Sequence, residues 1–150
     1  MAQWKYPVGQ ERFKTVAPVV TDAFHIDFGA MTTGTDTLKT YDAGTLLLAF
    51  GGRVAEAAEA LGSGTMQFGF TGTVLLTSAL ATGAMTAGAY IGPAPTNEDN
   101  LPLLLKSDDT FDVINATTGM SAGKVDMYVT YIPLPKTALD TNVFHVYKTT

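Results

Sequence analysis

The 150-residue chain contains no cysteine and few charges. Without cysteine it can form no disulfide framework, no thiol nucleophile and no cysteine-ligated zinc site. Charged residues make up 15% of the sequence, and the net charge of −5 argues against nucleic acid as a main partner. The first residues lack an apolar run, so we expect no secretory signal. A hydrophobic content of 46% is enough for one domain with its own core.

The chain has one long uncharged stretch, because no acidic or basic residue lies between Glu59 and Glu98. Within it, residues 74–91 are long enough to be considered as a membrane span. They contain several Thr, Ser and Gly residues, their apolar members are mostly alanine, and no Lys or Arg flanks them closely. We therefore expect no membrane partner, and short strands with small-residue turns in this stretch.

Alternation of apolar and polar residues with a period of two predicts half-buried antiparallel strands. It predicts strands at 24–28, 66–70 and 124–131, and further strands are predicted at 110–114 and 142–147. Residues 46–50 form a continuous apolar run, which predicts a strand covered on both sides. Turn-forming residues separate them at 33–36, 42–44, 51–52, 62–64, 93–95 and 118–119. Many short strands with frequent turns predict an all-β fold, either a sandwich or a small barrel.

Residues 53–61 favour a helix by propensity, because they are rich in alanine and glutamate. The preceding glycine pair is a poor N-cap, and the segment is short for an unsupported helix. The alternative is a strand in which Val54 and the neighbouring alanines pack inward. Both interpretations stay open at this point, with the strand preferred.

Residues 1–18 differ from the rest, because they interleave aromatic with basic side chains. The candidate partner-binding residues of this extended N-terminal arm are Trp4, Lys5, Tyr6, Arg12, Phe13 and Lys14. Such side chains grip an acidic or apolar neighbouring surface, and Trp, Tyr and Arg are the usual anchors of interfaces. In the alternative, the arm folds back and covers an edge strand of its own domain, residues 19–150.

One motif suggests catalysis, since residues 119–123 match the G-x-S-x-G pattern of hydrolases. Ser121, Asp126 or Asp140, and His145 occur in the chain order of a catalytic triad. A strand is predicted after the motif, however, where those hydrolases have a helix. We therefore interpret the motif as a tight turn and expect no enzyme.

The sequence evidence for a metal site is equally weak. The chain has two histidines, and His25 shares a predicted strand face with Asp27, but two ligands do not make a metal site. Asp108, Asp109 and Asp112 lack the spacing and the glycine of a calcium loop, so we interpret them as a solvated turn. We expect no cofactor.

Three stretches resemble the decoration or cement proteins of tailed bacteriophages, which are small β-sandwich auxiliary capsid proteins. They are 41–48 with its D-A-G-T start, 54–69, and 121–132 with its S-A-G-K start, and the likeness spans residues 20–132. The resemblance implies a jelly-roll-like antiparallel β-sandwich without a catalytic site. It also implies a small homo-oligomer, often a trimer, on the capsid surface. There it would bind the major capsid protein and cement neighbouring capsomers, with residues 60–97 as the oligomer interface or the inner face of the sandwich.

Three other functions remain open. A fibre, head-tail or tail component of a virion uses the same fold at a lower copy number. A carbohydrate-binding β-sandwich needs an exposed aromatic platform, for which Trp4, Tyr90 and Tyr128 are the candidates. A small hydrolase requires Ser121 as its nucleophile.

Overall fold

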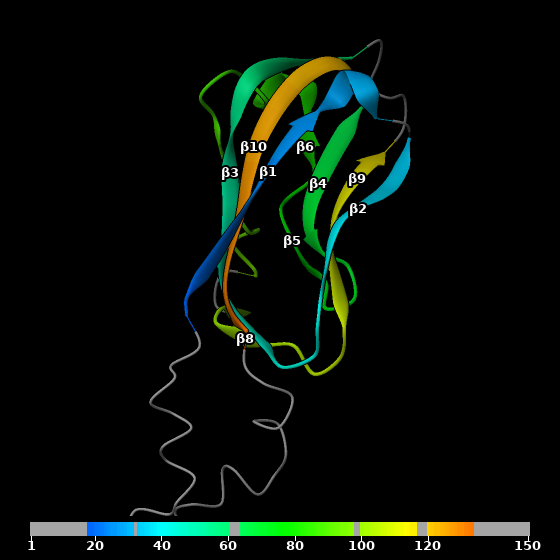
Figure 1. Cartoon of the computed structure of the whole chain (residues 1–150). Coiled ribbons are helices and arrows are strands. Elements are labelled where there is room, and N and C mark those ends of the chain that lie inside the picture. The colour runs from blue at the N-terminus through cyan, green and yellow to red at the C-terminus, as the bar shows by residue number, and fades with distance from the viewer. Residues whose placement is uncertain (1–17, 32, 61–63, 98–99, 117–119, 134–150) are drawn as a thin grey trace, which may run out of the picture.

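The computed structural model describes residues 18–31, 33–60, 64–97, 100–116 and 120–133, which form two antiparallel sheets packed face to face (Figure 1). Sheet A has the order β1 (Val20–Asp27), β10 (Met120–Pro133), β3 (Thr45–Ala60) and β7 (Tyr90–Ile91), and β8 (Leu103–Leu104) also pairs with β3. Sheet B has the order β2 (Gly34–Tyr41), β9 (Asp109–Ala116), β4 (Thr65–Phe70) and β5 (Leu75–Leu76), and β6 (Leu80–Ala81) also pairs with β4. Two short 3₁₀ turns, η2 (Phe28–Ala30) and η3 (Thr82–Ala84), complete the described elements. The all-β sandwich is confirmed, while the jelly-roll subtype stays a prediction.

The core lies between the sheets and is built by the predicted alternation. On β4, Met66 and Phe68 are fully buried, and the polar residue between them faces outward. On β10, Val125 and Val129 are fully buried, whereas the even-numbered residues from Lys124 to Thr130 lie on the outer face. Alternation therefore identified these strands because each has one face against the core.

Residues 53–60 form a strand, as preferred from the sequence, and belong to the 16-residue strand β3. Val54 and Ala58 point inward, with exposures of 1% and 9%. The turn predicted at Gly51-Gly52 is wrong, because β3 runs straight through both glycines and pairs there with β10. A Cβ atom on Gly52 would lie 2.1 Å from the carbonyl oxygen of Asp126, so the glycine permits a close approach of two backbones.

Strand β2 was missed, because residues 33–36 were interpreted as a turn. The strand begins at Gly34 and pairs with β9, with one irregularity between Thr37 and Lys39. It is the edge strand of sheet B, and its polar composition hides the alternation on which the prediction depended. The turn predicted at 42–44 is confirmed. The strand predicted at 142–147 lies outside the described residues.

The described part of the uncharged stretch, 64–97, contributes buried residues to the core and short strands to both sheets. After β4, the chain crosses between the sheets along the side where β3 and β4 lie. It pairs with β4 through β5 and with β3 through β7, and it buries Leu75, Met85 and Ile91. Part of the stretch is thus the inner face, one of its two expected roles, and its role as an oligomer interface stays a prediction. No helix in the described part of the chain is long and apolar enough to cross a bilayer.

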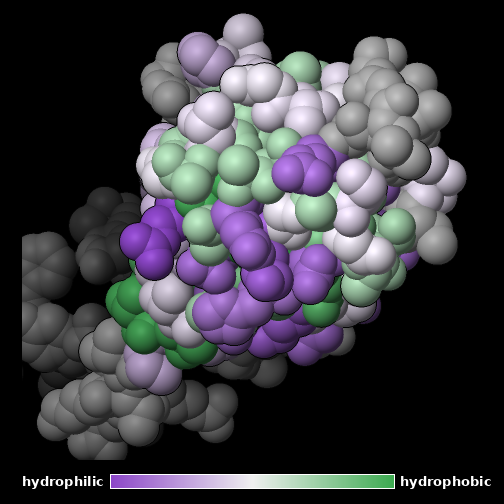
Figure 2. All heavy atoms as spheres, turned by 90° about the horizontal axis from the view of Figure 1, so that it is seen from above, coloured by the Kyte–Doolittle hydropathy of each residue, from purple (hydrophilic) through white to green (hydrophobic). Residues whose placement is uncertain are grey.

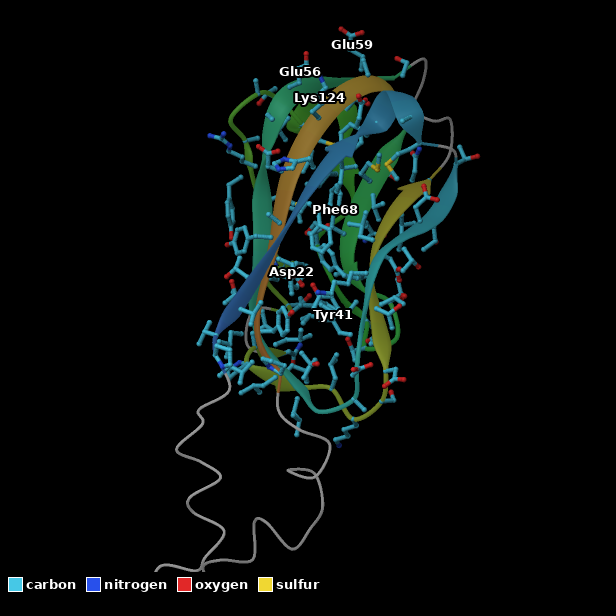
Figure 3. The ribbon with its side chains drawn as sticks, viewed as in Figure 1. Asp22, Tyr41, Glu56, Glu59, Phe68 and Lys124 are labelled. Atoms are coloured by element: carbon cyan, nitrogen blue, oxygen red, sulfur yellow. The ribbon has the colours of Figure 1, made fainter. Side chains whose placement is uncertain are left out.

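The described chain begins and ends at the same pole of the sandwich. Val20 of β1 pairs with Tyr131 of β10, and Pro133 pairs with Thr45 of β3. Figure 3 shows Glu56, Glu59 and Lys124 at the opposite pole. Residues 1–17 and 134–150 therefore both join the described chain at one pole, which is called the terminal pole below.

Candidate interaction surfaces

The six arm residues proposed to bind a partner all lie outside the described residues, so the structure gives only the point where the arm attaches. The terminal segments and the sandwich differ in the sign of their net charge. Residues 18–133 contain 12 acidic and four basic residues, whereas residues 1–17 and 134–150 contain five basic and two acidic ones. An acidic sandwich thus carries two basic terminal segments at one pole.

An ionic cluster joins the two sheets along the side formed by β1 and β2, which are the edge strands of sheets A and B. Asp22 Oδ2 accepts hydrogen bonds from Lys39 Nζ at 2.7 Å and from Tyr41 Oη at 2.8 Å. The Lys39 ammonium also lies 5.1 Å from the ring centroid of Tyr41 and 5.5 Å from that of Tyr131. Figure 3 shows Asp22 and Tyr41 between the two sheets. We call these four residues the Asp22 clamp.

The contacts within the clamp shift the pKa values of its own side chains. Partial burial raises the pKa of Asp22, but the hydrogen bonds from Lys39 and Tyr41 outweigh this effect and hold the pKa below its ordinary value. The hydrogen bond to Asp22 raises the pKa of Lys39 against the opposing effect of desolvation. Burial, followed by the neighbouring carboxylate, raises the pKa of Tyr41. Near neutral pH the clamp therefore contains a carboxylate, an ammonium group and a neutral phenol.

We expect the stability contributed by the clamp to depend on pH in a defined direction. Because the folded pKa of Asp22 is lowered, its contribution is complete above the unfolded value of about 4 and is lost as the pH falls through the folded pKa. Because the folded pKa of Lys39 is raised, its contribution is complete below the unfolded value and is lost only as the pH rises through the folded pKa. Asp22→Asn should cost about 1–2 kcal/mol at pH 7.

Urea unfolding of the wild type and of Asp22→Asn, at neutral and at acidic pH, tests this expectation. The difference in the free energy of unfolding should shrink towards zero at acidic pH, where Asp22 is protonated in both states. Asp36→Asn removes the same charge from β2, the edge strand of sheet B that carries Lys39 and Tyr41, and should change stability by less than about 0.5 kcal/mol at either pH. A difference for Asp22→Asn that stays constant with pH would contradict the ionic role.

The outer face of sheet A carries a cross-strand row of polar side chains. His25 Nδ1 lies 2.7 Å from Asp126 Oδ1, and Arg53 Nε lies 3.7 Å from Asp126 Oδ2. His25 shares a strand face with Asp27, but it bonds to Asp126, which lies directly opposite it on β10. Asp27 instead accepts a hydrogen bond from the backbone N–H of Gly29. Figure 2, a view onto the pole opposite the terminal pole, shows hydrophilic residues gathered in a band beside residues of intermediate to weakly hydrophobic character.

Ser121 lies near the start of β10, within an irregular stretch of its pairing with β3. Its hydroxyl donates to the carbonyl oxygen of Glu59 at 3.4 Å, and a strand follows it, as the sequence predicted. The interpretation of the motif as a tight turn is wrong for residues 120–123, which belong to the strand. Asp126, one proposed triad member, is bonded to His25, and the other two, Asp140 and His145, lie outside the described residues.

The interpretation of Asp109 and Asp112 as part of a solvated turn is wrong, because their exposures are only 7% and 2%. Three threonine hydroxyls donate to the carboxylate of Asp112; they belong to Thr37, Thr71 and Thr110. Asp109 Oδ1 accepts from the backbone N–H groups of Gly72 and Thr110. These bonds replace much of the lost hydration, although the buried Asp109 Oδ2 has no hydrogen-bond partner among the residues that the structure describes, and they fasten the turn after β4 onto β9.

Asp108 is exposed as expected, and its Oδ1 accepts from the backbone N–H of Ala43. The fastened turn after β4 presents Val74, which is 70% exposed at a positive φ of 58°. Among the described residues, no three acidic or histidine side chains lie close enough together to hold a metal ion.

Sequence reasoning missed the Asp22 clamp and the buried aspartates, because their partners come from other strands. Comparison with known proteins adds no assignment to these surfaces. No family model, curated protein or solved structure matches the chain.

Proposed function

We propose that this chain is a structural virion protein that binds the outside of a phage capsid lattice and cements neighbouring capsomers. The observation that carries the proposal is the division of charge between the acidic sandwich and its basic terminal segments, which attach together at one pole. The basic and aromatic residues of 1–18 are chemically suited to an acidic or apolar surface on a neighbour. The resemblance to decoration proteins points to the same role.

In this proposal the sandwich is the rigid body and the arm is the connector. The arm reaches a major capsid subunit or a sister subunit, and sister copies form a small oligomer, a trimer by resemblance. Each copy adds buried surface across a seam of the lattice, and many weak contacts sum through multivalency. The role needs no cofactor and no catalytic group. It places the protein on the capsid surface.

Particles that lack the protein should break at a lower temperature and under milder osmotic shock than complete particles, because the seams lose cross-links. Adding the purified chain back should restore both properties. The measurement is the release of the packaged genome during a temperature ramp and after rapid dilution from high salt. Equal stability with and without the protein would refute the cementing role.

Removal of residues 1–18 should abolish binding to particles that lack the protein, as measured by co-sedimentation. The double substitution Arg12→Ala with Lys14→Ala should weaken binding at least about tenfold, since basic anchors at an interface are worth one to several kcal/mol each. Lys106→Ala with Lys124→Ala removes the same charge from the sandwich and should leave binding unchanged. Full binding without residues 1–18 would refute the arm assignment.

The second candidate is another virion component, such as a fibre, head-tail or tail protein. It is distinguished by copy number, because a cement protein follows the stoichiometry of the capsid lattice. Quantitative mass spectrometry of purified particles measures this ratio directly.

A further inference from the structure

Two tyrosines from different strands converge on the outer face of sheet A. Tyr90 lies on β7 and is 71% exposed, and Tyr128 lies on β10. Between them lies Gly51 of β3, which pairs with Tyr128. A Cβ atom on Gly51 would be 3.0 Å from Tyr90 Oη and 3.2 Å from Tyr128 Oη. The two hydroxyl groups thus meet over a position that has no side chain.

A second glycine supports the Tyr90 ring. A Cβ atom on Gly92 would be 2.7 Å from Tyr90 Cε1, 2.9 Å from Oη and 3.1 Å from Cζ. The ring edge from Cε1 to Oη therefore lies against Gly92, and the hydroxyl reaches Gly51. With 71% of the residue exposed, the ring is supported by backbone and open to solvent. We call Tyr90, Tyr128, Gly51 and Gly92 the tyrosine platform.

The cross-strand row of polar side chains adjoins this platform. Arg53 pairs with Tyr90 in the register of β3 and β7, and Asp126 lies opposite Arg53 on β10. The Arg53 side chain is 72% exposed and that of His25 is 83% exposed. In this row Arg53 offers planar hydrogen-bond donors, and the carboxylate of Asp126 is an acceptor. The positive charge of Arg53 is balanced by the negative charge of Asp126. Such a rim complements a neutral ligand rich in hydroxyl groups better than it complements a phosphate or a polycation.

We propose that the tyrosine platform, with Arg53 and Asp126 at its rim, binds a neutral saccharide. A pyranose ring has an apolar C–H face that packs on an exposed aromatic ring, and hydroxyl groups at its edge that bond to guanidinium and carboxylate groups. The fixed ring reduces the entropy lost on binding, as preorganisation does in general. The proposal is independent of the capsid role, which concerns the arm and the terminal pole.

A glycan array probed with the full chain, followed by NMR titration with maltohexaose, cellohexaose and chitohexaose, tests the proposal. A neutral glycan should bind, and shifts should centre on residues 51–53, 90–92 and 126–128. Binding to no neutral glycan, or to anionic glycans alone, would overturn the proposal. Capsid binding, measured separately by co-sedimentation, is expected to be unaffected by the saccharide.

Variants assign the binding to the platform. Tyr90→Ala should weaken binding at least about tenfold, and Tyr90→Phe should retain most of it because the ring remains. Gly92→Ala should also weaken binding, since the new methyl group displaces the ring from its support. Val74→Ala shortens another exposed apolar side chain, on the turn after β4, and serves as the control that leaves affinity unchanged. Affinity that survives Tyr90→Ala would overturn the assignment.

Discussion

Replacing Gly52 with alanine is expected to lower the free energy of unfolding by about 3 kcal/mol or more, or to prevent folding altogether. The added Cβ atom would lie 2.1 Å from the carbonyl oxygen of Asp126 and 2.7 Å from Met127 Sδ. The methionine can rotate away, but the carbonyl belongs to the backbone of β10. Since β3 lies between β10 and β7, moving it away from β10 disturbs the centre of sheet A.

Urea unfolding followed by far-ultraviolet circular dichroism measures this effect, and Gly83→Ala is the matched control. A Cβ atom on Gly83 would meet no atom within 4 Å, so the same chemical change should alter stability by less than about 0.5 kcal/mol. Equal stabilities of the two variants would show that Gly52 is not required for the contact between β3 and β10.

The same glycine shows why one prediction from the sequence failed. A pair of glycines after an apolar run is typical of a turn, and Gly51-Gly52 was interpreted in that way. Here Gly52 allows a close approach of the β10 backbone, and Gly51 leaves room for two tyrosine hydroxyls. Both reasons lie in partners distant in sequence, which a local pattern does not contain.

The strands predicted by alternation share one property, which is a single face against the core. Residues 66–70 and 124–131 alternate cleanly because each strand separates core from solvent. Strand β2 has a weaker apolar signal, because it is an edge strand whose polar residues engage partners. Asp112, for example, receives a hydrogen bond from Thr37 across the pair.

The candidate surfaces were less accessible to sequence reasoning than the strands. His25 and Asp126 are separated by 101 residues, and only the register of β1 against β10 places them together. The clamp between Asp22 and Lys39 requires the two sheets to meet along one side. Tyr90 and Tyr128 were named from the sequence as aromatic candidates, but their convergence over Gly51 follows from strand order.

Truncation of Phe111 to alanine is expected to cost about 3–5 kcal/mol, the range for a buried phenylalanine. Phe111 lies on β9 and is fully buried. Its ring centroid lies 5.4 Å from that of Phe24 and 5.8 Å from that of Phe50, both on sheet A, and 5.3 Å from that of Phe70 on sheet B. Its removal therefore opens a cavity where the two sheets meet.

Thermal unfolding measures this cost, and the midpoint should fall by about 6–20 °C for a chain of this size. Phe111→Leu is the matched variant, because leucine keeps much of the volume and loses the aromatic edge contacts. It should cost less than half as much, since the cavity term is small when most of the volume is retained. If both variants lost the same stability, the aromatic contacts rather than the filled volume would hold the sheets together at this point, and the cavity argument would be wrong.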